Sequence, residues 1–172
     1  MRSLVNINCF ECRYGWLASR YLCDIQLPEY PGRRFPTADH AYWALIYPDT
    51  VEQYSTPLEW DPEAWLKVPS ANDINRECTH RMVEEFKANP NSVVPEATRV
   101  WTMRKVTRAK FDQHPGLKEK LIETNGHKLH YCNTWKDLFW GCETTSNGAY
   151  AGANWLGRIL MDLRSNYLEE AG

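Results

Sequence analysis

Prolines and helix-capping residues divide this sequence into short helical segments, and this punctuation constrains the fold more than any other feature. Proline suits the first turn of a helix but breaks its interior, and Thr, Ser or Asn ahead of an apolar run caps its start. The pattern predicts helices over 38–47, 62–66, 71–89, 95–113 and 115–124, and a last helix that begins after Asn154.

Shorter segments between these helices carry the signals of strands and loops. Alternating apolar residues predict strands at 4–10, 21–27 and 127–132, and repeated glycines predict a loop over 141–153. Few short strands among many helices indicate the α+β class. A length of 172 residues predicts a single, mostly helical domain covering residues 1–172.

Composition limits the classes of partner. The net charge is −2, so a site for a polyanion must be a local patch, and the 13% aromatic content suits a core or stacking walls for bases. No apolar run reaches the roughly 18–20 residues needed to cross a bilayer, and Asn6 and Asn8 interrupt the first apolar stretch, so we expect no membrane partner and no signal peptide.

Six cysteines without a secretion signal predict reduced thiols and a cytoplasmic location. Cys9 and Cys12 have the spacing of half a zinc site, but no second half follows. Small buried core residues are the preferred interpretation, and we expect neither a metal nor a cofactor.

Asp39 is the first candidate for chemistry. It falls in the first turn of the helix that Thr37 caps, where the free N–H groups favour an ionised carboxylate. Such a group can orient water or stabilise a developing cation, although this segment alone favours ordinary helix-end electrostatics. His40 lies about 100° further around the helix, and it is interpreted as a core or surface histidine.

A second cluster joins Asp137 to the aromatic residues Trp135, Phe139 and Trp140. It could form a stacking wall beside a carboxylate, or an aromatic core. The loop that follows enters a helix at Asn154, a natural position for phosphate, but it lacks a Walker pattern.

The helix over 95–113 is rich in basic residues. Arg104 and Arg108 are spaced i,i+4 and could clamp a phosphate, or they could belong to a solvated basic face.

These separate signals occur in the order of motifs that one family shares. FPTADH at 35–40 resembles its W-P-T-x-E-H block, and KFDQ at 110–113 resembles its K-F-x-Q block. DLFWG at 137–141 resembles D-x-[FY]-W-G, and NWLGRILMDLR at 154–164 resembles N-x-L-G-x-x-L-M-x-x-R. The sequence thus resembles the NADAR (YbiA-like) family over nearly its whole length.

The resemblance implies a largely helical α+β domain that hydrolyses N-glycosidic bonds at C1 of a ribose. Family members act on ribosylamino-pyrimidine phosphates of riboflavin synthesis or remove ADP-ribose from guanine in nucleic acid. Asp39 stands at the position of the family's acidic Glu, whereas Ile46 replaces a family Lys.

The resemblance also places Asp137, Trp140 and Asn154 in pocket motifs.

We therefore predict a metal-independent N-glycosidase for a phosphorylated ribosyl compound or ADP-ribosylated nucleic acid. Asp39 and Asp137 are its predicted catalytic acids. The predicted substrate-binding residues are Trp140 and Trp43 for the base, with Asn154, Gly157, Arg104 and Arg108 around the phosphate. A catalytically inactive module that binds ADP-ribose or a nucleotide is the alternative, and the oligomeric state is left open.

Overall fold

The computed structural model describes residues 6–59 and 61–172, whose backbone contacts group into two compact units. The central unit comprises residues 19–113. The terminal unit combines residues up to 18 with residues 114–172. The single domain predicted over residues 1–172 stays a prediction.

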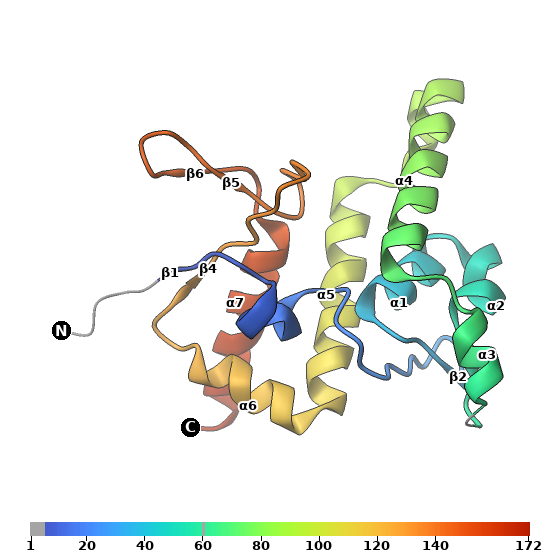
Figure 1. The fold of residues 1–172 in the computed structure, drawn as a ribbon, viewed down its shortest axis with the longest axis horizontal. Helices are drawn as coiled ribbons and strands as arrows, with labels where there is room; N and C mark the ends of the chain where they lie inside the picture. The colour runs from blue at the N-terminus through green and yellow to red at the C-terminus, as the bar shows by residue number, and fades with distance from the viewer. Residues whose placement is uncertain (1–5, 60) are drawn as a thin grey trace. The chain divides into compact units, whose positions relative to one another are not determined.

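The central unit is built around one buried helix. Its elements are β2 Arg33–Arg34, α1 Ala38–Ile46, η2 Pro48–Thr50, α2 Val51–Tyr54, β3 Thr56–Pro57, α3 Pro62–Lys67, α4 Ala71–Ala88, η3 Pro90–Ser92 and α5 Glu96–Gln113. Figure 1 shows α1 between the longer helices α4 and α5, and it packs against both. Every residue from Ala38 to Ala44 is buried, and the alanines at every third position let neighbouring helices approach closely.

The strands of the central unit are shorter than predicted. β2 and β3 pair antiparallel, with Arg34 opposite Thr56. The strand predicted over 21–27 is wrong, because this segment forms only an isolated bridge between Ile25 and Phe35. The Cys23 N–H still donates to the Pro36 carbonyl over 2.9 Å, but the opposing segment enters α1 directly after Thr37, so no longer ladder forms.

The terminal unit joins both ends of the described chain. Its elements are β1 Asn6–Ile7, η1 Cys12–Leu17, α6 Pro115–Glu123, β4 Lys128–Leu129, β5 Glu143–Thr144, β6 Tyr150–Ala151 and α7 Trp155–Glu170. β1 pairs in parallel with β4, so the strand predicted over 4–10 is reduced to two described residues, and residues 4 and 5 lie outside the described ranges. The strand predicted over 127–132 likewise shortens to β4.

The stretch predicted as a loop over 141–153 contains a hairpin of β5 and β6. Gly148 makes its turn with a φ of 79°, a left-handed conformation that glycine adopts without steric cost. The dipeptide Asn147-Gly148 is typical of a hairpin turn. The prediction of a loop rested on the repeated glycines of the whole stretch and did not use this dipeptide.

Helix α7 is fixed against α6 and β4 (Figure 1). The buried guanidinium of Arg164 donates hydrogen bonds to the carbonyl oxygens of Thr124 (2.6 Å) and His127 (3.0 Å). The Thr124 carbonyl also accepts the His127 N–H over 2.9 Å, so Arg164 adds a second donor there and ties α7 to the turn that follows α6.

The predicted helices are confirmed, with ends that differ by at most one residue, and so is the mostly helical α+β class with a few short strands. Across the described ranges, no helix combines the length and the apolar character that crossing a membrane requires.

Candidate functional site

Asp39 is buried in the first turn of α1, as its position after Thr37 predicts. Its side chain and backbone leave only 5% of the residue exposed. The amide of Asn75, on α4, donates a hydrogen bond to Asp39 Oδ2 over 2.7 Å, and the indole N–H of Trp43 donates to Asn75 Oδ1 over 2.6 Å. We call these three residues the Asp39 chain. It fixes one carboxylate oxygen through two helices, which is the rigidity that a charge-stabilising group needs.

Lys110 provides a positive charge in the same unit. It is 1% exposed, and its Nζ lies 5.3 Å from the centre of the Tyr21 ring. Burial lowers the pKa of Lys110 to about 8, while electrostatic attraction to Cys23 and Asp39 acts in the opposite direction. A lysine with this pKa changes its charge close to neutral pH, which is unusual outside functional sites.

His40 is a core histidine whose two ring nitrogens are both engaged. Its Nε2 lies 2.8 Å from the Pro69 carbonyl oxygen, an acceptor, and its Nδ1 lies 2.8 Å from Thr37 Oγ1. The Thr37 oxygen also accepts the backbone N–H of His40, so its own proton points to Nδ1. Burial lowers the pKa of His40, which favours the neutral ring with the proton on Nε2.

Trp43 belongs to an aromatic cluster in the core. Its ring stacks on Tyr47 at 5.9 Å between centroids and meets Tyr42 edge-on at 4.9 Å. The residue is 6% exposed, and its N–H holds Asn75. The observed role of Trp43 is thus to support the Asp39 chain, and its predicted stacking on a base stays a prediction.

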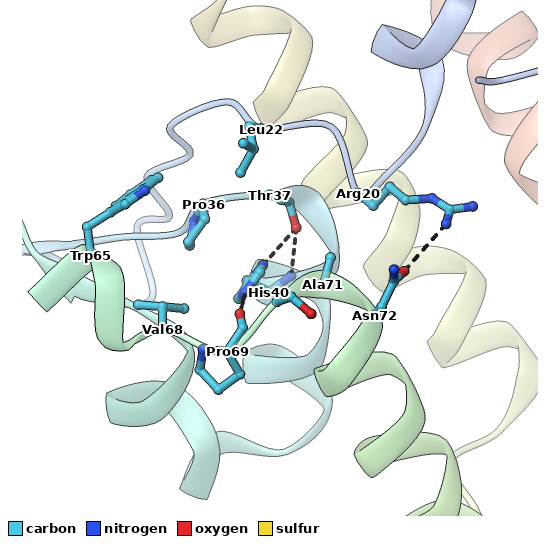
Figure 2. Close-up of a pocket in the computed structure, with 11 residues that line it drawn as sticks. Arg20, Leu22, Pro36, Thr37, His40, Trp65, Val68, Pro69, Ala71 and Asn72 are labelled. Carbon is cyan, nitrogen blue, oxygen red and sulfur yellow. Dashed lines mark hydrogen bonds between the residues drawn. The ribbon is translucent and has the colours of Figure 1, made fainter. Parts of the chain in front are cut away.

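A cavity of about 300 Å³ opens beside the start of α1, and Figure 2 shows its lining. Thr37 and His40 contribute the α1 side, and the segment that joins α3 to α4 forms the opposite wall. Asp39 itself is not a lining residue. The lining consists of Arg20, Leu22, Pro36, Thr37, His40, Trp65, Val68, Pro69, Ser70, Ala71 and Asn72.

The basic side chains of α5 do not share one environment. Arg104 and Arg108 are exposed, as a solvated face requires, and Arg108 Nε pairs with Asp112 at 3.2 Å. Lys105 pairs with Glu29. The phosphate clamp predicted for Arg104 and Arg108 stays a prediction.

In the terminal unit, Asp137 organises a tight turn. Its Oδ1 accepts the backbone N–H groups of Phe139 (3.0 Å) and Trp140 (2.9 Å), and its own backbone N–H and carbonyl bond to the Asn133 side chain. An acidic side chain at this position therefore has a structural role, because its oxygen accepts the backbone N–H groups of the turn. The catalytic role predicted for Asp137 stays a prediction.

Trp140 is half-buried and meets the Phe139 ring edge-on at 4.7 Å. Its neighbour Gly141 is required by packing, because a Cβ there would lie 2.2 Å from the Tyr131 carbonyl oxygen. Trp140 thus lies on a well-fixed turn, and its predicted contact with a base is compatible with its partial exposure.

Asn154 begins α7 in a left-handed conformation, with φ of 51°. The prediction that its side chain caps the helix is wrong. Asn154 Oδ1 instead accepts the Tyr131 N–H (2.9 Å), and Nδ2 donates to the Leu129 carbonyl (3.0 Å), so the side chain ties α7 to the β4 segment.

The start of α7 offers fewer donors to a phosphate than expected. The N–H groups of Trp155 and Leu156 already donate to the carbonyls of Phe139 and Trp140. Gly157 is a packing glycine, because a Cβ there would lie 2.3 Å from the Leu129 carbonyl oxygen. The substrate-binding roles predicted for Asn154 and Gly157 stay predictions.

The structure thus brings Asp39 and Trp43 together through a residue that the sequence analysis missed. Asn75 carries no local signal of this role. Lys110 enters the sequence analysis only as the first residue of the KFDQ motif, although its spacing from Met103 and Val106 places it on the apolar face of α5.

Within the described ranges, no three His, Cys, Asp or Glu side chains gather where they could hold a metal ion. Cys132 and Cys142 lie close, with 3.6 Å between their sulfur atoms, but a pair alone is not a zinc site.

Comparison with known proteins agrees with the order of the sequence motifs. The pattern of the NADAR domain matches residues 10–167, which is most of the chain. The chain belongs to the NADAR family. The matched region includes the Asp39 chain, Lys110, the Asp137 turn and the start of α7.

Individual NADAR relatives carry two kinds of name. The chain is 41% identical over 133 residues to the N-glycosidase YbiA of Shigella boydii, covering 77% of this chain and 71% of that protein. It is 30% identical over 158 residues to a riboflavin biosynthesis protein of Vibrio vulnificus, covering 92% of this chain but only 37% of that longer protein.

The fold is also similar to the NMR structure of YbiA from Escherichia coli. The TM-score is 0.56 at 21% identity, and the match covers 99% of this chain and 92% of that chain. At this identity the likeness concerns the fold alone.

Proposed function

We propose that this protein is an N-glycosidase that hydrolyses the bond between C1 of a phosphorylated ribose and the nitrogen of a planar ring or its amino group. Membership of the NADAR family and similarity to an N-glycosidase support the reaction class. The observation that carries the proposal is the buried Asp39 carboxylate, fixed by Asn75 in the first turn of α1.

The reaction needs a negative charge near C1. As the C1–N bond breaks, the electron pair stays on nitrogen and the ribosyl group gains oxocarbenium character. Water then adds its oxygen to C1, and its proton replaces the lost bond on nitrogen. A carboxylate that is already oriented stabilises the cationic transition state more than the neutral substrate, and only this difference raises the rate.

The substrate class follows from the family and its relatives. We propose a ribosylamino-pyrimidine phosphate or ADP-ribosylated guanine, and the riboflavin biosynthesis name of one relative favours the former. Since Asp39 supplies the charge stabilisation, we also propose that no metal is needed. Activity that survives overnight treatment with EDTA supports this, whereas a loss that zinc restores contradicts it.

The deciding experiment is single-turnover hydrolysis by wild type, Asp39→Asn and Asp39→Glu. Asn keeps the shape but removes the charge, so turnover should fall about 10²–10³-fold. Glu should keep measurable activity, because the family uses this side chain. Asp49→Asn, at an exposed position that pairs with Arg81, is the matched control and should leave the rate unchanged. Circular dichroism verifies that each variant is folded.

One observation favours a second function, a module that binds the ligand without turning it over. Ile46, at the last position of α1, stands where the family has a Lys. The same assay separates the two functions. Retention of intact ligand by a folded wild type, with no turnover, supports the module, and wild-type rates in Asp39→Asn remove Asp39 from the mechanism.

A further inference from the structure

We propose that the cavity beside α1 recognises the two ends of a ribosyl monophosphate, with Arg20 as the contact for the phosphate and Trp65 as the stacking wall for the ring. The choice of this ligand rests on the function proposed above. The inference adds two specificity residues on the central unit, neither of which belongs to the motif blocks at 35–40 and 110–113.

The cavity has two chemically different ends. Figure 2 shows Trp65 at one end and Arg20 at the other, with Leu22 and Val68 on facing walls near Trp65. Asn72 and Ser70 add polar groups to the lining. Among the described residues that line the cavity there is no Asp or Glu, so its fixed charge comes from an arginine. A ligand with an apolar planar part and an anionic part matches this arrangement.

Arg20 suits a phosphate because its guanidinium offers several N–H donors in one plane. One of them, on Nη1, donates to Asn72 Oδ1 over 3.4 Å, a long hydrogen bond to a neutral acceptor. A phosphate oxygen placed at this end of the cavity offers the same group a charged acceptor. Such charge-assisted bonds are shorter and stronger than those to an amide.

Trp65 is positioned by a well-capped short helix. Asp61 accepts the backbone N–H of Glu63 over 2.9 Å, and Pro62 begins α3. Trp65 is half-buried and lines the cavity. Stacking of a base on such a ring tolerates either a purine or a pyrimidine, because each has an aromatic face.

Helix α4 contributes residues both to the cavity and to the Asp39 chain. Asn72, which lines the cavity, and Asn75, which holds Asp39, are three positions apart and share one face of that helix. A volume of about 300 Å³ is at the lower end for small-molecule sites. It therefore favours a single ring and phosphate over a complete dinucleotide.

Binding of stable N-glycosides to the full chain tests the inference without requiring turnover. The probes are uridine 5′-monophosphate and uridine, measured by calorimetry. We expect wild type to bind the monophosphate at least about tenfold more tightly. Arg20→Gln should bring the monophosphate to the affinity of uridine and leave uridine unchanged. Trp65→Ala should weaken both about tenfold or more, and Trp65→Phe should keep most of the affinity.

Two exposed residues of the same unit are the matched controls. Arg76→Gln and Trp101→Ala remove an arginine and a tryptophan that do not line the cavity, and both variants should bind as wild type does. The inference is overturned if wild type binds neither probe, if Arg20→Gln keeps the preference for the monophosphate, or if the controls weaken binding equally.

The outcomes also separate this inference from the proposed function. The expected binding pattern without hydrolysis of either proposed substrate keeps the cavity assignment and refutes the N-glycosidase. The opposite result is hydrolysis that depends on Asp39 but not on Arg20 or Trp65, in a protein without the binding pattern. It keeps the N-glycosidase and refutes the cavity assignment.

Discussion

Replacing Lys110 by Met should change the pH dependence of stability in a direction that the structure fixes. The pKa of Lys110 falls from its ordinary value of 10.5 to about 8 because the side chain is buried. Between these two pH values the unfolded chain binds one more proton than the folded protein, so the free energy of unfolding of wild type rises with pH.

The magnitude follows from the pKa difference. A shift from 10.5 to about 8 corresponds to about 3 kcal/mol, at about 1.4 kcal/mol per pKa unit. Below pH 8 both states are protonated, and the folded protein carries the whole cost of burying the charge. This cost disappears as the pH approaches 10.5. Lys110→Met never carries it, so the stability of wild type relative to Lys110→Met should increase by about 3 kcal/mol between pH 7 and pH 10.5.

Urea unfolding of both proteins across this range measures the effect. Comparing wild type with the variant cancels the groups whose pKa Lys110 does not influence, such as Cys142, whose pKa burial raises to about 12. The thiol of Cys23, whose pKa the charge of Lys110 lowers, is not among them. Lys87→Met, at an exposed position of α4, controls for the loss of any lysine. A constant difference between wild type and Lys110→Met from pH 7 to pH 10.5 would refute the burial of an ionisable amine at this position.

Two further substitutions test packing and positioning. Gly157→Ala should lower the free energy of unfolding by about 1–3 kcal/mol, because its Cβ would lie 2.3 Å from the Leu129 carbonyl oxygen; unchanged urea unfolding would contradict this close approach. Trp43→Phe keeps an aromatic ring but removes the N–H that holds Asn75, so kcat for hydrolysis should fall about tenfold in a folded protein. An unchanged kcat would mean that Asn75 does not need this donor to position Asp39.

The helices of this protein could be predicted because their boundaries are encoded locally. Thr37 and Ser70 accept N–H groups of the helices that follow them, and Pro115 opens α6, so each start depends on residues within one turn. The strands could not be predicted as well. Their lengths depend on the partner. The pattern of residues 21–27 suits a strand, but the segment opposite them enters α1 after Thr37.

The candidate site was predictable in part for the same reason. The place of Asp39 in a first helical turn follows from the sequence around it. Its bond to Asn75 joins residues 36 positions apart and exists only because α4 packs on α1. For Asn154 the local sequence was misleading. Its position ahead of α7 suggests a helix cap, but its side chain bonds to the distant segment that contains Leu129 and Tyr131.

The parallel pairing of β1 with β4 has a consequence for synthesis of the chain. Ile7 pairs with Leu129, which lies 122 positions later, so β1 leaves the ribosome long before its partner exists. At about 5–20 residues per second the interval is roughly 6–24 seconds. The internal contacts of the unit formed by residues 19–113 need no later residue and can form during this time. The first strand therefore lacks its β4 partner throughout the interval, and the middle of the sequence can fold before the two ends pair.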